Sequence, residues 1–310
     1  MPKHLDDKRV RLAAFKWLKE QVDRHGDVLS RGLLSDGFVL DGRRIPLVSR
    51  QGIFKPAVLA EIPLTISTTP KGPYDDKLSP EGLMLYSYRG TDPNHRENAG
   101  LRKAMIEKTP LIYLHGILPG RYMAVWPVLV VGDSPDELRF SVAVDSHNYI
   151  RTYADSDERD VMGREDKDLG RRQYITSVIR QRLHQRGFRE RVLDAYEQQC
   201  ALCRLRHPEL LDAAHIIPDG EPGGEPVVNN GLALCKLHHA AFDQYFLGIR
   251  PDHVVAVRRD ILEEDDGPML THGLQGLNGN RILLPRSSKR RPSPERLEVR
   301  YTRFLSAGRT

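Results

Sequence analysis

Cysteine is scarce in this sequence, with only three among 310 residues. Three cysteines cannot all pair in disulfides, and neither a cleavable signal nor a lipidation motif is evident at the N-terminus. A disulfide-stabilised secreted fold is therefore not expected. Long apolar runs are lacking too, because the longest, residues 123–131, is too short to cross a bilayer and contains Pro127. We expect a cytoplasmic protein that makes no membrane contact.

A large excess of charge of one sign is also absent. The formal net charge is +5 and the isoelectric point is near 9.1, which is too mild to identify a polyanionic partner by itself. Hydrophobic residues make up 39% of the chain and charged residues 29%, as in soluble globular proteins. A chain of 310 residues is long enough for two domains, each with a core of its own.

The three cysteines belong to two short-spaced pairs of the metal-ligand type. Cys200 and Cys203 are separated by two residues, and Cys235 is followed by His238 at the same spacing. Structural zinc is usually held in a tetrahedron by two such pairs of cysteine and histidine ligands. The spacing predicts a Cys3His site for a structural Zn²⁺ ion, with disulfide pairing as the alternative.

Around these four ligands the sequence predicts a strand, a loop, a second strand and a helix. An apolar run at residues 210–217 ends at Pro218, and the turn-rich residues 219–226 lead to a second run at 227–234. A helix is expected from Cys235 to about Tyr245. The polar side chains of this unit that are not zinc ligands include His215 on the first strand, Asn230 at the start of the second strand, and His239 on the helix.

The segments Ala-His-Ile-Ile-Pro, Asn-Gly-Leu-Ala-Leu-Cys and Cys-Lys-Leu-His-His together resemble the HNH endonuclease family, whose domain has the ββα-metal fold. The resemblance implies that His215 is the general base for the attacking water, that Asn230 orients the loop and His215, and that His239 holds a catalytic Mg²⁺ or Mn²⁺. It also implies cleavage of DNA to 5′-phosphate and 3′-hydroxyl ends. The chemistry agrees, because a neutral histidine accepts a proton near pH 7 and one metal ion can stabilise charge at the phosphate.

One position departs from the family pattern. Many members have an aspartate metal ligand directly before the general base, where this chain has Ala214. Asp212, two residues further back on the same strand face, and Asp243, one helical turn after His239, are the two candidates for that role. The choice between them stays open at this level, since Asp243 could also belong to an ordinary helix surface and Asn230 could be a turn residue.

Two basic segments flank the nuclease-like unit. The first contains six arginines that are expected to contact DNA phosphates: Arg171, Arg172, Arg180, Arg182, Arg186 and Arg189. The second, residues 286–291 near the C-terminus, is a candidate for the same role. A solvated helix face and a loose tail are the respective alternatives.

The N-terminal half has a different pattern of apolar and turn residues. Apolar residues recur at helical spacing from Asp7 to Val28, and Gly26 is a plausible end for this helix. From residue 37 to 144, short apolar runs alternate with turn residues, which predicts a β-rich domain with a bent or barrelled sheet and one inserted helix at 98–108. We therefore predict an α+β protein with a DNA-recognition domain at 1–150, a charged linker at 151–170, and an HNH domain at 171–310 that ends in a basic tail.

The N-terminal domain bears a more diffuse resemblance to the companion region of McrA-like HNH restriction enzymes. Its sheet-rich pattern is similar to that of PUA and SRA-type domains, which read modified cytosine by flipping the base. A flipped base needs an aromatic ring to stack on and an acceptor for the cytosine amino group. The candidates for this pocket are Tyr74, Asp75, Asp76, Tyr86, Tyr88 and Arg89. The alternative for Tyr86 and Tyr88 is that they pack on one face of a strand.

The sequence thus predicts a metal-dependent HNH endonuclease that cuts double-stranded DNA and is directed to methyl- or hydroxymethylcytosine by its N-terminal domain. Two copies could act together as a homodimer to cut both strands, because each carries one nuclease site. Two alternatives stay open. One is an HNH nuclease that reads unmodified sequence or DNA structure, and the other is a zinc-stabilised DNA-binding module that has lost catalysis.

Overall fold

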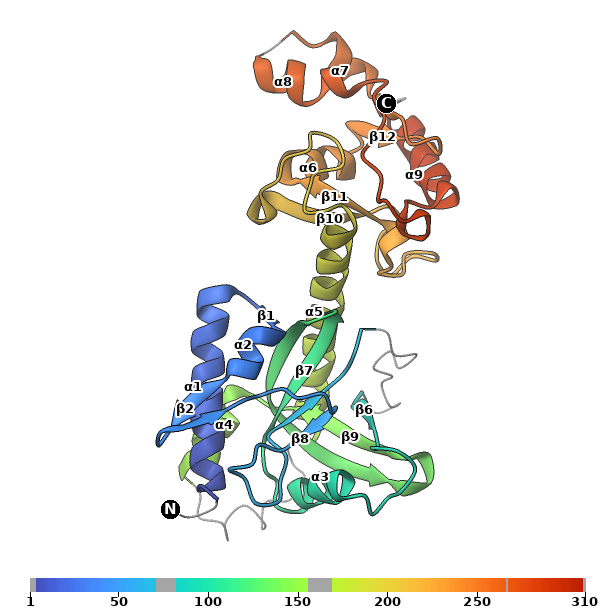
Figure 1. Cartoon of the computed structure of the whole chain (residues 1–310). Coiled ribbons are helices and arrows are strands. Elements are labelled where there is room, and N and C mark those ends of the chain that lie inside the picture. Colours follow the sequence, from blue (N-terminus) through green and yellow to red (C-terminus); the bar gives the residue numbers. More distant parts are fainter. Residues whose placement is uncertain (1–3, 71–81, 156–168, 266, 309–310) are drawn as a thin grey trace. The chain divides into compact units, whose positions relative to one another are not determined.

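A computed structural model describes residues 4–70, 82–155, 169–265 and 267–308 of the chain (Figure 1). It divides into two compact units, residues 1–183 and 184–310, which we describe separately. The long helix α5 (Leu169–Ala195) contributes residues to both units. Among the described residues, no helix has both the length and the apolar composition that a membrane span requires.

The first unit is built on a curled sheet of seven strands. Six strands follow one another in the order β4, β5, β7, β8, β9 and β6, and β1 pairs with β8 outside this path. The paired strands are antiparallel except for β5 and β7, which run parallel. The strands are β1 (Val28–Ser30), β4 (Ile53–Phe54), β5 (Thr65–Ser67), β6 (Met84–Ser87), β7 (Leu111–Leu118), β8 (Arg121–Ser134) and β9 (Arg139–Val144), with a separate hairpin of β2 (Phe38–Leu40) and β3 (Arg43–Ile45).

Helices cover both faces of this sheet, because its long strands carry apolar side chains on both sides. In β8, Met123 and Val125 face a core that also contains residues of α3 and α5, whereas Tyr122 and Ala124 face a core shared with α1 and α2. The helices of this unit are α1 (Asp7–His25), α2 (Arg31–Asp36), α3 (Arg96–Ile106), α4 (His147–Asp155) and the first part of α5. The prediction of a β-rich domain behind an N-terminal helix is confirmed.

The ends of α1 follow from local chemistry. The Asp6 side chain accepts hydrogen bonds from the backbone N–H groups of Lys8 and Arg9, and Gly26 ends the helix with a φ of 79° that favours glycine. The helix predicted at 98–108 is α3.

The division between the two compact units falls within α5, after Leu183. The reason is that Ile175, Ile179 and Leu183 of this arginine-rich helix pack into the core of the first unit. Residues 151–155 are the end of α4, and α5 begins at Leu169.

The second unit contains the predicted strand, loop, strand and helix. Strand β10 (Leu211–His215) pairs antiparallel with β11 (Gly231–Cys235), and α6 (Lys236–Asp243) follows directly and lies against both. The remaining elements are β12 (Leu247–Ile249), β13 (Val255–Val257), α7 (Arg259–Glu263), α8 (Pro268–Gly273) and α9 (Pro294–Ala307). Short 3-10 turns lie at 135–137 in the first unit and at 208–210, 228–230, 275–277 and 288–290 in the second.

Candidate active site and metal cluster

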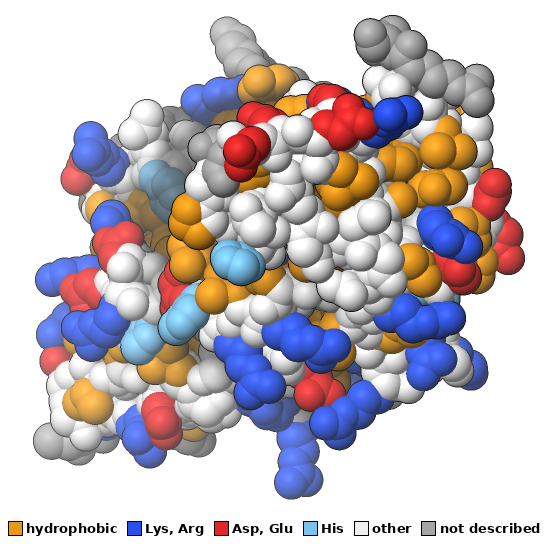
Figure 2. All heavy atoms as spheres, turned by 90° about the horizontal axis from the view of Figure 1, so that it is seen from above, with side chains coloured by type: hydrophobic (Ala, Val, Ile, Leu, Met, Phe, Trp, Pro, Cys, Tyr) orange, Lys and Arg blue, Asp and Glu red, His pale blue; other side chains and the backbone are white. Residues whose placement is uncertain are grey.

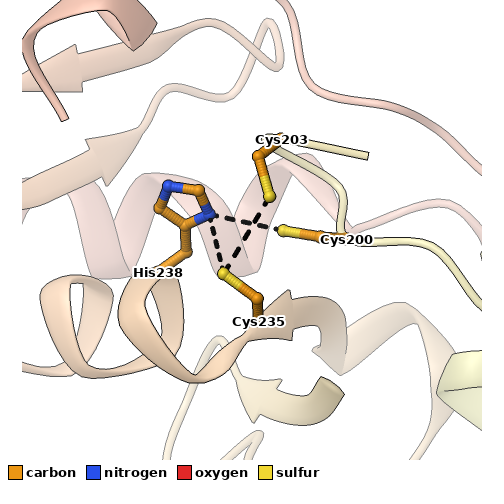
Figure 3. Close-up of side chains that lie close together, drawn as sticks. All are labelled: Cys200, Cys203, Cys235 and His238. Atoms are coloured by element: carbon orange, nitrogen blue, oxygen red, sulfur yellow. Dashed lines mark hydrogen bonds between the residues drawn. The ribbon is translucent and has the colours of Figure 1, made fainter. Parts of the chain in front are cut away.

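The four predicted zinc ligands lie together in the second unit. Their ligand atoms are all within 4.8 Å of one another, and Figure 3 shows the three sulfurs and the His238 ring converging. The Nδ1 atom of His238 is 3.4 Å from the Cys200 sulfur and 3.2 Å from the Cys235 sulfur, and the sulfurs of Cys203 and Cys235 are 4.0 Å apart. Tetrahedral ligands at zinc–ligand distances of roughly 2.0–2.3 Å are separated by similar amounts. The cysteines form no disulfide.

A hydrogen bond outside the cluster fixes the His238 ring. Its Nε2 lies 2.7 Å from the backbone carbonyl oxygen of Gly273, which can only accept, so Nε2 carries the proton and Nδ1 presents its lone pair to the sulfurs. The donor types and the spacing of the four ligand atoms therefore fit a structural zinc ion.

His215 ends β10 directly opposite Gly231. Its ring stacks on Phe188 of α5, with the centroids 4.0 Å apart and an angle of 20° between the planes. Its Nε2 is buried and has no hydrogen-bond partner within the described part of the chain. Burial lowers the pKa of His215 below the ordinary 6.5, and the charge of His239 adds to this effect, whereas Asp219 and Asp243 oppose it. His215 is therefore neutral at pH 7 with one ring nitrogen available, as a general base must be.

Gly231 allows α5 to approach β11 at this point. Its backbone is extended, with a φ of −130°, so any residue could adopt the conformation. Space is what excludes a side chain, because a Cβ atom would lie 2.4 Å from a methyl carbon of Val192 and 2.9 Å from the Phe188 ring. The ring that supports His215 is thus packed directly on the glycine of the facing strand.

Replacing Gly231 with alanine is expected to lower the free energy of unfolding of the second unit by about 1–3 kcal/mol, as overpacking typically does. The displaced Phe188 ring should also move His215, so catalytic activity should fall further than the loss of folded protein explains. Thermal unfolding and cleavage rates would test this, with Gly267→Ala as the control because no atom lies within 4 Å of its added methyl group. Equal stability of G231A and the wild type would contradict the packing argument.

Asn230 holds the loop that follows His215. It is fully buried, its Oδ1 accepts a hydrogen bond from the backbone N–H of Ile217 at 2.9 Å, and its Nδ2 donates to the carbonyl oxygens of Ile217 and Glu225. Its hydrogen bonds in the described part of the chain go to this loop, and none goes to the His215 ring. The Asn230 side chain is thus linked to the backbone of Ile217, two residues after His215.

His239 lies on α6 between the two aspartates that the sequence left as alternatives. Its Nε2 is 3.3 Å from Asp243 and its Nδ1 is 3.7 Å from Asp212. The hydrogen bond to Asp243 is the main reason that the pKa of His239 is raised, and the same bond lowers the pKa of Asp243. The structure therefore brings His239, Asp243 and Asp212 together, close enough to His215 for His239 and Asp243 to affect its pKa.

The two aspartates differ in their other partners. Lys236 donates a hydrogen bond to Asp212, and the Arg189 guanidinium lies 3.3 Å from its other carboxylate oxygen. Burial raises the pKa of Asp212, but these cations and His239 outweigh it, so the net shift is downward. Asp243 is half exposed, and its only other cation among the described residues is Arg300 at 3.7 Å. Asp212 is thus already neutralised by the fold, whereas Asp243 is open to a ligand.

The arginines predicted to bind DNA have partners within their own units. Arg171 and Arg172 bind the buried Asp145, Arg182 binds Asp27, Arg186 lies 3.9 Å from Glu190, and Arg189 also donates to the carbonyl oxygens of Pro208 and Leu211. Arg180 has a buried Nε without a partner among the described residues. Much of this positive charge is therefore paired with acidic side chains of the same unit. Arg172 and Arg189 are only 11% and 19% exposed.

The C-terminal basic segment is anchored rather than loose. Arg286 pairs with Glu197 at 2.6 Å, in the turn after α5, and Arg290 pairs with Asp194 at 3.1 Å, in the last turn of α5. Figure 2 shows Lys and Arg side chains gathered along the lower edge of the face it draws, with few acidic side chains among them.

Of the residues proposed for a base pocket, Tyr74, Asp75 and Asp76 lie outside the described residues. Tyr86 and Tyr88 are only 9% and 7% exposed and belong to a core of the first unit. The Tyr88 ring stacks on Phe140 at 4.5 Å, and its hydroxyl donates a hydrogen bond to Asp133. Arg89 is exposed and lies 3.9 Å from Glu97. The two tyrosines thus pack on one face of their strand, as the alternative interpretation holds.

Sequence reasoning missed two residues that touch the site. Phe188 stacks on the His215 ring, and the Arg300 guanidinium lies near the Asp243 carboxylate. Phe188 could have been flagged as an apolar residue amid the arginines of α5. Arg300 gave no such signal, because it lies 57 positions after Asp243 on a separate helix.

Residues 200–250 match the family model described as HNH endonuclease. Among solved structures, the chain is similar to a "Modification dependent TagI restriction endonuclease", with 16% identity over 78% of this chain and 82% of that one and a TM-score of 0.28. It is also similar to the "Type IV phosphorothioation-dependent restriction endonuclease ScoMcrA", with 16% identity over 61% of this chain and 47% of that one and a TM-score of 0.20. The chain matches no curated protein.

The residues matched by the family model include all four members of the Cys3His cluster together with His215, Asn230 and His239. The residues that the family model matches are thus the ones whose geometry is described above, and this stretch of the chain is similar to an HNH endonuclease domain.

Proposed function

We propose that this protein is a metal-dependent DNA endonuclease, and that the N-terminal domain directs it to DNA with modified cytosine. The observation that carries the nuclease assignment is the separation of two neighbouring sites. His238 belongs to the Cys3His cluster, whereas the next residue, His239, contacts Asp243 and Asp212 near a neutral His215. One cluster suits a structural ion and the other suits phosphodiester hydrolysis.

In this proposal His215 takes the proton of the attacking water through its ring nitrogen. Phe188 holds the plane of the imidazole, and Asn230 fixes the loop that begins after it. His239 and Asp243, one helical turn apart on α6, would hold the catalytic Mg²⁺ or Mn²⁺. When bound, such an ion stabilises negative charge at the phosphate and at the leaving oxygen.

The contacts of the two aspartates support different roles for them. Asp243 faces Nε2 of His239 and is half exposed, which suits a ligand that shares an ion with that nitrogen. Asp212 faces Nδ1 on the other side of the ring and is neutralised by Lys236 and Arg189, which disfavours cation binding. A carboxylate that receives the second ring N–H of a metal-binding histidine orients that ring. We therefore assign Asp243 as the second protein ligand and Asp212 as the residue that orients His239.

The assignment of modified cytosine rests on the sequence resemblance of residues 1–150 to PUA and SRA-type domains. Tyr86 and Tyr88 are core residues in this structure, so a flipped base would have to use other residues or require them to move. The candidates Tyr74, Asp75 and Asp76 remain part of the proposal. Two copies would cut the two strands of one site, since each chain carries one HNH domain.

We expect plasmids that carry 5-methylcytosine or 5-hydroxymethylcytosine to be cut faster than a matched unmodified plasmid in the presence of Mg²⁺ or Mn²⁺. Gel analysis of the three substrates at equal enzyme concentration measures this preference. Equal cutting of all three would rule out modified-base recognition and leave a nuclease that reads unmodified DNA. If the wild type bound DNA but failed to nick it with Mg²⁺, Mn²⁺, Co²⁺ or Ni²⁺, the chain would instead be a zinc-stabilised binding module.

A further inference from the structure

Arg300 of α9 is a buried cation beside the candidate active site. It is only 5% exposed, and its guanidinium lies over two aromatic rings, 4.5 Å from the centre of Phe242 and 4.3 Å from that of Tyr245. Both rings belong to the end of α6 or to the turn that follows it. Burial of a guanidinium is costly unless its N–H groups are hydrogen-bonded.

The hydrogen bonding of Arg300 is incomplete. One N–H donates to the carbonyl oxygen of Phe242 at 2.8 Å, and the same nitrogen lies 3.7 Å from Asp243. The buried Nε has no partner among the described residues. An apolar residue of similar volume would fill this space without an unsatisfied polar group and is often equally stable. Packing alone therefore does not account for an arginine here.

Arg300 is connected through Asp243 to His239, one of the proposed active-site residues. The carbonyl oxygen of Phe242 accepts the hydrogen bond from Arg300 at the C-terminus of α6, where a cation is also favoured by the helix dipole. Asp243, the next residue, is hydrogen-bonded to His239. A single guanidinium thus contacts both the backbone of the last turn of α6 and the side chain that faces His239.

Helix α9, which carries Arg300, is closely packed against the second unit. The Phe304 ring packs on Gly248 of β12, where a Cβ atom would lie 2.6 Å from it, and Leu297 is completely buried. These two residues flank Arg300 by one helical turn on each side. The backbone that carries the guanidinium is therefore held in place on both sides.

We propose that Arg300 is a positioning residue that fixes Asp243 against His239, so that the catalytic ion site extends beyond residues 200–250 to helix α9. This inference rests on the proposed function, because it takes Asp243 and His239 as the residues that hold the ion. The neutral Arg300→Gln variant can still donate to the Phe242 carbonyl but no longer attracts the Asp243 carboxylate.

The test is the affinity of the zinc-loaded full chain for Mn²⁺, measured by titration calorimetry. Arg300→Gln should weaken Mn²⁺ binding about tenfold or more, as loss of an outer-shell partner typically does. Arg303→Gln is the matched control, since Arg303 lies on the same helix and pairs with Glu221 at 2.7 Å. In an Asp243→Asn background, Arg300→Gln should cause no additional loss, because the two residues act on the same site.

Zinc content and thermal unfolding show whether each variant is folded. Arg300→Lys, which keeps the charge but has no planar fork, replaces Arg300→Gln if the latter does not fold, and a several-fold loss of Mn²⁺ affinity is then expected. Unchanged Mn²⁺ affinity in either folded variant, or failure of both variants to fold, would overturn the positioning role. If the wild type binds Mn²⁺ through His239 but cuts no DNA, the proposed function fails while the role of Arg300 stands.

Discussion

Replacing His239 with alanine is expected to lower the rate of DNA cleavage by well over about a hundredfold, while the protein stays folded and keeps its zinc. Loss of an outer-shell partner of a metal site already costs about 10–100-fold, and His239 would be a direct ligand. The side chain of His239 is 26% exposed and contacts Asp212 and Asp243 rather than the core. Its removal therefore leaves the packing of α6 intact.

The adjacent His238→Ala variant is expected to behave in the opposite way, with loss of zinc and unfolding of the second unit. His238 is 2% exposed, and its Nδ1 faces the sulfurs of Cys200 and Cys235. Structural zinc contributes roughly 10–16 kcal/mol of folding free energy, as much as the entire stability of a typical domain, about 5–15 kcal/mol.

Zinc content, thermal unfolding and plasmid nicking on the two purified variants distinguish these outcomes. If H239A lost its zinc and H238A kept it, the two histidines would have to exchange roles. If both variants kept zinc and both lost activity, the Cys3His cluster would not be the structural site.

The sequence was sufficient to predict the features that depend on neighbours along the chain. The four residues of the Cys3His cluster lie within 39 residues, and their two-residue spacings determine which face of the loop and of α6 they occupy. Likewise, the apolar runs at 210–217 and 227–234, with turn residues between them, located the two strands and the helix that follows. Local spacing in the sequence predicts these features because helices and strands present side chains at fixed intervals.

The features that were missed depend on contacts between distant segments. Phe188 meets His215 because α5 packs across β11 at Gly231, and no spacing in the sequence encodes that crossing. For the same reason, the arginines of α5 were expected to face DNA, whereas Arg172 is bound by the buried Asp145. The same holds for Tyr88, because an aromatic ring is equally suited to a base pocket and to a hydrophobic core. The contact with Phe140, which places Tyr88 in the core, cannot be read from the sequence.

The second large effect is expected from replacing His215, the proposed general base. Replacing His215 with alanine should lower the cleavage rate by about 10²–10⁴-fold, the range typical of general acid–base catalysis, with zinc content and Mn²⁺ affinity unchanged. The neutral ring is the active form, so the wild-type rate should rise with pH through the pKa of His215 and level off above it. Because burial lowers this pKa, the rising limb should lie below pH 6.5.

Rates from pH 5 to 8 on one plasmid substrate measure both the size and the position of this effect. His207→Ala is the matched control, because His207 is an exposed histidine of the same unit and its loss should leave the profile unchanged. A rising limb above pH 6.5 would show that the imidazole is not held neutral by burial against Phe188. Residual activity of H215A within about tenfold of the wild type would be too high for the loss of a general base and would assign the proton transfer to another group.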